Sequence, residues 1–191
     1  MGVTDLSSER FERLFAVRYR TVAAYLIRRC ATVEDAEDAA VEVFATVWRR
    51  IADVPREPDD LPWLYGVARR VLANQTRSRR RRERLLARLT DAASRLGRGF
   101  IEAPTSETGG ILEALHRLPE RDRELLMLIG WEDLSVSEAA RVLRLPGPLV
   151  SRRLYRARQR FRIELANQGR HDERATETSQ PITNPSPQET T

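Results

Sequence analysis

Arginine side chains are concentrated between Ser135 and Arg162, in two helical patterns joined by a short break. Guanidinium groups bind phosphates and the edge of guanine through paired hydrogen bonds. No Asp or Glu lies between Arg144 and Arg162, so nothing within that stretch neutralises the charge. Basic charge along one helix favours nucleic-acid binding, and the alternative is a solvated arginine-rich terminal helix.

Local sequence signals predict how these arginines are positioned. Ser135 and Glu138 have the spacing of a capping box, in which each side chain satisfies a backbone N–H of the other residue. The run Arg144–Gly147 ends that helix, and Pro148 suits the first turn of the next one. One apolar stripe follows at helical spacing: Leu149, Val150, Leu154, Ala157, Phe161 and Leu165. A support helix, a tight turn and a basic second helix predict a helix-turn-helix that reads a DNA major groove.

A second basic stretch lies far from the first. The Pro and Asp content of Asp53–Pro62 predicts a loop, and a helix with Trp63 and Leu64 near its start follows. That helix becomes strongly cationic from Arg77 to Arg84. Continuous like charge repels itself unless an anion neutralises it, so this run is not expected in a core.

The N-terminal part of the chain predicts two further helices. Ser8–Arg29 has a largely apolar stripe at helical spacing. Thr32 is a candidate N-cap for a helix that runs to about Ile51. Asp38 and Glu42 lie one turn apart on that helix and present carboxylates toward a basic partner.

No alternating strand pattern occurs, so we expect an all-α fold. The chain divides into two small helical domains joined by a flexible linker, with the helix-turn-helix in the second domain and a disordered tail. The predicted segments are a helical domain at residues 1–93, a linker at 94–110, a helix-turn-helix domain at 111–166 and a tail at 167–191.

Composition narrows the functional classes. The net charge of +5 favours a polyanionic partner. Cys30 is the only cysteine and His116 and His171 are the only histidines, so we expect no metal site and no cofactor. No apolar run reaches the length of a membrane span and no signal-peptide pattern is present, which favours a soluble, cytoplasmic protein without membrane insertion.

Separate motifs resemble one family. Ala36–Phe44 with Trp48-Arg49 resembles the clamp-binding helix of the extracytoplasmic-function sigma factors of bacterial RNA polymerase. Leu61–Arg70 and the arginines after it resemble the family's downstream-promoter helix. Leu118–Arg121 and Leu134–Arg158 are similar to its upstream-promoter helix-turn-helix. The resemblance covers about residues 10–88 and 110–166, in the family's order and with its linker.

The resemblance implies a two-site promoter reader that binds polymerase core through the clamp helices of its largest subunit. Its implied polymerase contacts are Asp38, Glu42, Phe44, Trp48 and Arg49. The implied contacts to the downstream (−10) element are Arg56, Trp63, Arg69, Arg70, Asn74, Arg77, Arg80 and Arg81. The implied contacts to the upstream (−35) element are Ser135, Leu149, Ser151, Arg152, Arg153, Arg156 and Arg160. An inhibitory anti-sigma protein is a further implied partner.

Position along the second helix suggests different roles for the upstream contacts. Leu149, Ser151, Arg152 and Arg153 lie near its N-terminus and can reach base edges. Arg156 and Arg160 are placed to hold phosphates, which position the protein without specifying sequence.

The aromatic residues have two interpretations. Trp63 and Tyr65 can stack on unpaired bases, but a Trp at helical spacing with Leu64 is more often part of a core. Phe44 and Trp48 are also expected to pack in the core, with Trp48 at the edge of the polymerase surface.

The sequence departs from the family's pattern at four places, one of them a pair of residues. Val41 stands where the family usually has glutamine, and Arg70 stands where it usually has asparagine. Arg144 occupies a turn position that commonly carries glycine, so it must adopt an uncommon backbone conformation or reshape the turn. Pro148-Leu149 replaces a small residue followed by threonine, which removes a hydroxyl and favours an upstream sequence preference particular to this chain.

Two other functions are compatible with parts of the chain. An autonomous helix-turn-helix regulator binds duplex DNA without polymerase, but it needs neither the acidic helix with Asp38 and Glu42 nor a second basic helix. A nuclease or another enzyme is the weakest alternative, because no carboxylate–histidine cluster, nucleophile elbow or phosphate-binding loop is present.

Overall fold

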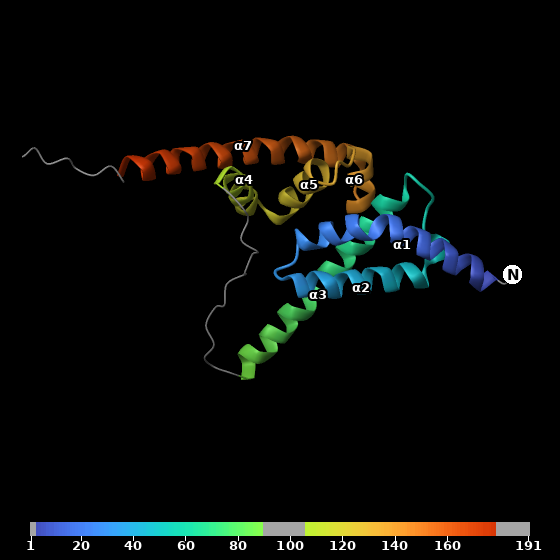
Figure 1. Ribbon diagram of the computed structural model, residues 1–191. Coiled ribbons are helices and arrows are strands. Elements are labelled where there is room, and N and C mark those ends of the chain that lie inside the picture. Colours follow the sequence, from blue (N-terminus) through green and yellow to red (C-terminus); the bar gives the residue numbers. More distant parts are fainter. Residues whose placement is uncertain (1–2, 90–105, 179–191) are drawn as a thin grey trace, which may run out of the picture. The chain divides into compact units, whose positions relative to one another are not determined.

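The computed structural model describes residues 3–89 and 106–178, and within them the chain forms seven α-helices and one short 3₁₀ helix without any strand (Figure 1). This confirms the predicted all-α fold. The elements are α1 (Val3–Ile27), α2 (Val33–Arg49), the 3₁₀ helix η1 (Ile51–Asp53), α3 (Asp60–Leu89), α4 (Ser106–Arg117), α5 (Glu120–Gly130), α6 (Val136–Leu143) and α7 (Gly147–Thr178).

The helices form two compact units. The first contains Met1–Glu102 and Met127–Arg152, and the second contains Ala103–Leu126 and Arg153–Thr191. The division therefore falls inside α5 and α7. Each unit is thus made of two separate segments, whereas each predicted domain is one continuous segment of the chain. The predicted boundaries at residues 93, 110 and 166 stay a prediction.

Helices α1, α2 and α3 pack against one another in the first unit. Figure 1 shows α1 and α2 side by side. Thr32 caps α2 as predicted, since its Oγ1 accepts a hydrogen bond from the Asp35 N–H at 3.0 Å. The buried side chains of these three helices include Val22, Tyr25, Leu26, Ala39, Val43, Phe44, Val47, Leu64, Tyr65, Ala68 and Val71. The apolar faces expected from helical spacing thus form one core.

Helix α6 also belongs to the first unit and packs against α3. Its predicted capping box is present: Ser135 Oγ accepts from the Glu138 N–H, and Glu138 Oε2 accepts from the Ser135 N–H at 2.8 Å. The helix ends in a Schellman motif, in which the Leu145 N–H donates to the Ala140 carbonyl and the Arg144 N–H to the Arg141 carbonyl. Arg144 adopts the uncommon left-handed conformation (φ 54°, ψ 48°) that its place in this turn requires.

The second unit contains α4, the first part of α5 and most of α7. Its buried residues include Ala114, Leu115, Leu118, Leu125, Leu154 and Ala157. Arg160 on α7 forms an ion pair with the buried carboxylate of Asp122 on α5. This contact lies beside the apolar core and links the two helices.

Two helices of the structure extend into segments that were predicted as linker and tail, and those predicted boundaries stay a prediction. Residues 106–110, assigned to the linker, form the start of α4, while the rest of the predicted linker from residue 94 lies outside the described residues. Residues 167–178, assigned to a disordered tail, continue α7. Gln168 is 6% exposed, and with its amide nitrogen toward the Gly110 carbonyl it accepts from the Ala114 N–H at 3.0 Å. Helix α7 thus contacts α4 at Gln168 and continues to Thr178, and residues 179–191 lie outside the described part.

Candidate nucleic-acid interface

The loop between η1 and α3 is attached to α1 by two arginines. Arg10 donates to the Val54 carbonyl, and Arg18 Nε donates to Asp60 Oδ2 at 2.8 Å. Asp60 is 3% exposed, and its hydrogen bond with Arg18 raises the pKa of that guanidinium, so Arg18 stays charged. Arg18 also pairs with Glu57. The predicted DNA-reading loop is therefore fixed to the helical core, while Arg56 within it is exposed.

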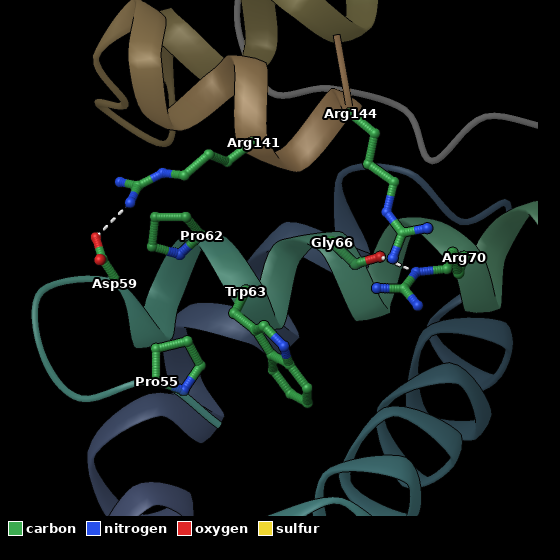
Figure 2. A pocket seen from close by; sticks show the side chains of 8 residues that line it. All are labelled: Pro55, Asp59, Pro62, Trp63, Gly66, Arg70, Arg141 and Arg144. Atoms are coloured by element: carbon green, nitrogen blue, oxygen red, sulfur yellow. Dashed lines mark hydrogen bonds and ion pairs between the residues drawn. The ribbon is translucent and has the colours of Figure 1, made fainter. Parts of the chain in front are cut away.

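An open pocket of about 300 Å³ lies between this loop, α3 and the end of α6, all within the first unit (Figure 2). Its lining residues are Pro55, Asp59, Pro62, Trp63, Gly66, Arg70, Arg141 and Arg144. Trp63 is half-buried at one wall, and the Arg50 guanidinium lies 5.7 Å from its ring centroid. One aromatic face and several cations thus share a small concave site.

Arg70 stands in a positive field. Its Nε donates to the Gly66 carbonyl at 3.0 Å, which aims the guanidinium along α3 toward the pocket (Figure 2). Partial burial, together with the charges of Arg144 and Arg50, lowers the pKa of Arg70. Like charges that are held together in this way attract an anion, and phosphate oxygens are suitable acceptors for guanidinium donors.

Six of the residues predicted to contact the downstream element, five arginines and one asparagine, form a row along α3. Arg69, Arg70, Asn74, Arg77, Arg80 and Arg81 are all exposed. Arg77 Nη2 donates to Asn74 Oδ1 at 2.6 Å, so these two side chains, which are three residues apart, contact each other on the helix surface. We call this row, together with residues 54–59 and Trp63, the α3 basic surface. All eight residues predicted to contact the downstream element therefore belong to the α3 basic surface.

Tyr65 is not available for stacking on a base. Its side chain is 1% exposed, and its ring stacks on Tyr25 with centroids 4.7 Å apart. Its hydroxyl donates to Glu132 Oε2 at 3.2 Å. The base-stacking interpretation therefore does not hold for Tyr65, whereas Trp63 lies between core and surface.

The residues predicted for the upstream element lie at the start of α7 and along it. Ser151, Arg152, Arg156 and Arg160 are exposed, and Leu149 and Arg153 are half-buried. Ser151 Oγ donates to the Gly147 carbonyl at 3.2 Å. Ser135 is engaged in the cap of α6, and the Arg160 guanidinium faces Asp122. At the first turns of α7, Arg152 and Arg153 form no ion pair with an acid in the described part of the chain, and the Ser151 hydroxyl is exposed.

Helix α2 carries the acidic surface. Asp38, Glu42 and Arg49 are exposed, and the Arg49 guanidinium donates to Thr46 Oγ1 at 3.1 Å. Trp48 is 44% exposed, which differs from the core position expected for it. Its ring and that of Phe11 make an edge-to-face contact with centroids 5.1 Å apart. Phe44 is 4% exposed and supports this surface from the core.

A cluster that the sequence did not predict joins the segment just after α1, helix α3 and the segment before α6. The Glu132 carboxylate accepts from Arg28 Nη2 at 2.7 Å and Arg29 Nη1 at 2.9 Å, as well as from Tyr65. Burial, followed by the charge of Glu132, raises the pKa of the Tyr65 phenol, so the hydroxyl stays a donor. No local pattern points to these pairs, because the partners lie more than 60 residues apart along the chain.

The described residues contain neither a metal-binding group of side chains nor a membrane-spanning helix. No group of three or more His, Cys, Asp or Glu side chains in the described part is arranged to hold a metal ion. No helix in that part is long and apolar enough to span a bilayer. The absence of a metal site and of a cofactor stays a prediction.

Two family models match the chain. Residues 14–82 match sigma-70 region 2, and residues 109–161 match sigma-70 region 4. Together the two matches cover more than half of the chain, and they contain the acidic surface of α2, the α3 basic surface and the basic start of α7.

Curated relatives carry the same description. The chain is 29% identical over 163 residues to the probable RNA polymerase sigma factor RfaY of Xanthomonas campestris pv. campestris, covering 82% of this chain and 40% of that protein. It is 26% identical over 156 residues to the ECF RNA polymerase sigma-E factor of Haemophilus influenzae, covering 76% of this chain and 82% of that protein. The chain thus spans less than half the length of the RfaY relative.

The fold is also similar to a solved structure. The sigma factor RpoE from Bartonella quintana, crystallised in complex with the anti-sigma factor NepR, matches with a TM-score of 0.66 at 21% identity. The match covers 82% of this chain and 96% of that one. At this identity the likeness concerns the fold.

Proposed function

We propose that this chain, which belongs to the extracytoplasmic-function sigma factors, directs bacterial RNA polymerase to promoters by reading a −10 and a −35 element. The observation that carries the proposal is the presence, in one chain, of an exposed acidic surface on α2 and two separate basic surfaces, on α3 and α7. A protein that only binds duplex DNA needs one basic surface and no acidic one. In this role the chain binds and positions DNA in the cytoplasm without catalysing a reaction itself.

The acidic surface is the proposed contact with polymerase core. Asp38 and Glu42 are exposed one turn apart, and Trp48 adds a partly exposed aromatic edge beside Arg49. Charge pairs with a basic partner steer association, while a partly desolvated aromatic supplies contact area. Phe44 acts from beneath by holding the α2 surface in place. The proposed partner is the clamp-helix region of the largest polymerase subunit.

The α3 basic surface is the proposed −10 site. Its arginines follow the phosphates of one strand, and Trp63 offers a ring face for an unpaired base. The loop at residues 54–59 is rigidly attached to α1 through Arg10 and Arg18, so it can meet a base that leaves the stack without first becoming ordered.

The start of α7 is the proposed −35 site. Arg152 and Arg153 occupy the first turns of the second helix, where side chains of a helix-turn-helix reach base edges. Arg156 lies one turn further and suits a phosphate contact. An anti-sigma protein is a further proposed partner, supported by the complex in which the structurally similar RpoE was solved.

Transcription with purified components tests the proposal. Core polymerase alone, core with this chain, and core with Asp38→Asn/Glu42→Gln are compared on genomic fragments, with core binding measured in parallel. The double variant is expected to weaken core binding and lower promoter-specific initiation. Glu37→Gln is the matched control, since Glu37 is an exposed acid on the same helix outside the proposed surface. Tight, specific binding to duplex DNA without core, and no promoter-specific transcript with it, would favour the autonomous regulator.

A further inference from the structure

The open pocket beside α3 has two different ends (Figure 2). At one end Asp59 Oδ1 pairs with Arg141 Nη1 at 2.6 Å, so the charge of Arg141 is compensated. At the other end Arg70 and Arg144 come together, and neither forms an ion pair with an acid in the described part of the chain. Trp63 lies between the two ends. We call this site, with the eight lining residues given above, the Trp63 pocket; it offers an aromatic ring beside two uncompensated positive charges.

The two arginines at the cationic end are held close to each other by the fold. Arg144 has a left-handed backbone (φ 54°, ψ 48°), which is disfavoured for an L-residue other than Gly, and its side chain extends toward α3 (Figure 2). Arg70 Nε donates to the Gly66 carbonyl at 3.0 Å, which fixes the orientation of its guanidinium. After partial burial, the charge of Arg144 contributes to the lowered pKa of Arg70. Strained residues and perturbed charges of this kind are concentrated at ligand sites, where a bound group compensates them.

The chemistry of the cationic end selects a terminal phosphate. A phosphate monoester carries about two negative charges near neutral pH and has three acceptor oxygens. A phosphodiester of a DNA strand carries only about one charge. The guanidinium groups of Arg70 and Arg144 can each donate paired hydrogen bonds to a terminal phosphate, whose charge balances theirs. Asp59 repels a phosphate at the opposite end, so such a ligand has one preferred orientation.

The remaining walls of the pocket suit a planar ring. Trp63 is half-buried, and Pro55 and Pro62 lie near it in the lining. Nucleobases stack on aromatic side chains whatever their sequence, because every base has a π-face. The volume of about 300 Å³ is at the lower end of the range for small-molecule pockets, so the space suits one nucleotide rather than several.

We propose that the Trp63 pocket binds a free nucleoside 5′-phosphate, with the base against Trp63 and the terminal phosphate between Arg70 and Arg144. The proposal goes beyond the proposed function, because it concerns a small ligand that is not part of a promoter. It gives Arg144, at the end of α6, a role in ligand binding. Since Trp63 and Arg70 also belong to the α3 basic surface, a nucleotide within a DNA strand is the other source of the same chemistry.

Calorimetric titration of the full chain with ATP tests the phosphate end of the pocket. We expect a one-to-one complex with a dissociation constant below about 1 mM, and an affinity at least about tenfold lower for Arg70→Gln and for Arg144→Gln, because each removes one cationic donor. Arg69→Gln is the matched control, since Arg69 is the neighbouring exposed arginine of α3 and does not line the pocket. Its affinity should stay within about twofold of the parent chain at physiological salt. An absence of saturable ATP binding, or an equal loss of affinity in Arg69→Gln, would overturn the proposal.

Tripolyphosphate tests the aromatic end of the pocket. We expect Trp63→Leu to weaken ATP binding at least about tenfold, since it removes the stacking surface, and to leave the affinity for tripolyphosphate unchanged. Trp131→Leu is the matched control, because Trp131 is an exposed tryptophan outside the pocket. Equal affinities of the parent chain for ATP and tripolyphosphate, with no effect of Trp63→Leu, would reduce the site to one for any polyanion and refute the assignment of a nucleoside.

Single-stranded DNA separates the two sources of a nucleotide. A short oligodeoxyadenylate without a terminal phosphate carries diesters only, and we expect it to bind the parent chain more weakly than ATP and with the same affinity in Arg144→Gln. Tighter binding than ATP, lost in Arg144→Gln, would assign the pocket to a DNA strand and contradict the proposal.

Promoter-specific transcription with core polymerase tests the proposed function independently of this ligand. A chain that supports transcription but does not bind ATP refutes the nucleotide site alone. A chain that binds ATP in the pocket but supports no promoter-specific transcription refutes the proposed function alone.

Discussion

Arg160 forms an ion pair with Asp122, and the Asp122 side chain is 8% exposed whereas that of Arg160 is 54% exposed. Position on the basic helix alone marks Arg160 as a phosphate ligand. In the folded chain its guanidinium instead faces a carboxylate in the first turn of α5. A phosphate contact by Arg160 would have to compete with this internal acid, so Arg156, for which the described residues provide no carboxylate partner, is the better phosphate ligand of the two.

The Asp122–Arg160 pair predicts a specific stability effect. Asp122→Asn should lower the free energy of unfolding by about 1 kcal/mol, because it leaves a buried polar group with a weaker hydrogen bond to a half-exposed arginine. Urea denaturation measures the change. Glu120→Gln removes an exposed acid from the same first turn and matches the loss of helix-dipole compensation. An equal loss in both variants would assign the effect to the dipole.

Arg152 and Arg153 are predicted to set upstream sequence preference. Arg152→Ala and Arg153→Ala should each reduce discrimination between the preferred −35 sequence and single-base variants by about 1–3 kcal/mol where the side chain makes a paired contact with a base. Competitive binding of holoenzyme to a promoter library measures this discrimination. Arg162→Ala, an exposed arginine further along the same helix, is the control. Uniform weakening on every sequence would assign Arg152 and Arg153 to phosphate contacts.

Local chemistry explains why much of the fold follows from the sequence. The caps at Thr32 and Ser135 depend on neighbours within a few residues and appear as predicted, and Arg144 takes the left-handed conformation, one of the two outcomes expected for its turn. The contacts of Glu132 with Arg28, Arg29 and Tyr65 depend on segments that meet only after folding, and a lone Glu between Trp131 and Asp133 carries no sign of these partners. The contact of Gln168 with α4 is of the same kind, since the polar sequence around Gln168 gives no sign of it.

The predicted interface shows the same difference between features that neighbouring residues determine and features that depend on how distant segments pack. Arginine-rich runs identify the exposed cations of α3 and α7 because like charges avoid a core. Burial of aromatic residues is set by which helix faces meet, and here Tyr65 is buried while Trp48 is exposed. Spacing alone cannot tell these two positions apart, because both have apolar neighbours at helical intervals.

Cys30 is predicted to react slowly in the folded chain. Burial, followed by the nearby charge of Asp35, raises the pKa of its thiol to about 11. The thiolate is the reactive form, so alkylation near neutral pH should be roughly 100-fold slower than in urea. Mass spectrometry after timed exposure to iodoacetamide measures the rates. Ala45→Cys in a Cys30→Ala chain places a thiol at an exposed site of α2 and should react at similar rates in both conditions.

Arg144 is predicted to be a strained position. An L-residue other than Gly in the left-handed region is disfavoured by about 1–2 kcal/mol, so Arg144→Gly should be about 1 kcal/mol more stable than Arg144→Ala. Both variants remove the same charge from the pocket, and their difference therefore isolates the backbone term. Thermal unfolding of the two proteins side by side measures it. Equal stability would mean that the Schellman turn relaxes away from the left-handed conformation when the side chain is shortened.

The α6 cap predicts a pH-dependent contribution to stability. Hydrogen bonds from the Ser135 side chain and backbone lower the pKa of Glu138 below its ordinary value. A carboxyl whose pKa is lower in the folded state stabilises the fold above its unfolded-state pKa of about 4.3, and this contribution is lost as the pH falls through the folded-state value. Glu138→Gln should therefore unfold at a lower temperature than the parent near neutral pH, and the gap should close on acidification. Ser135→Ala removes the donor that shifts the pKa, so in that background the same substitution should show a smaller change with pH. Two results would mean that Ser135 does not lower the pKa of Glu138. One is a difference in unfolding temperature that stays constant with pH, and the other is a difference that changes equally with pH in the Ser135→Ala background.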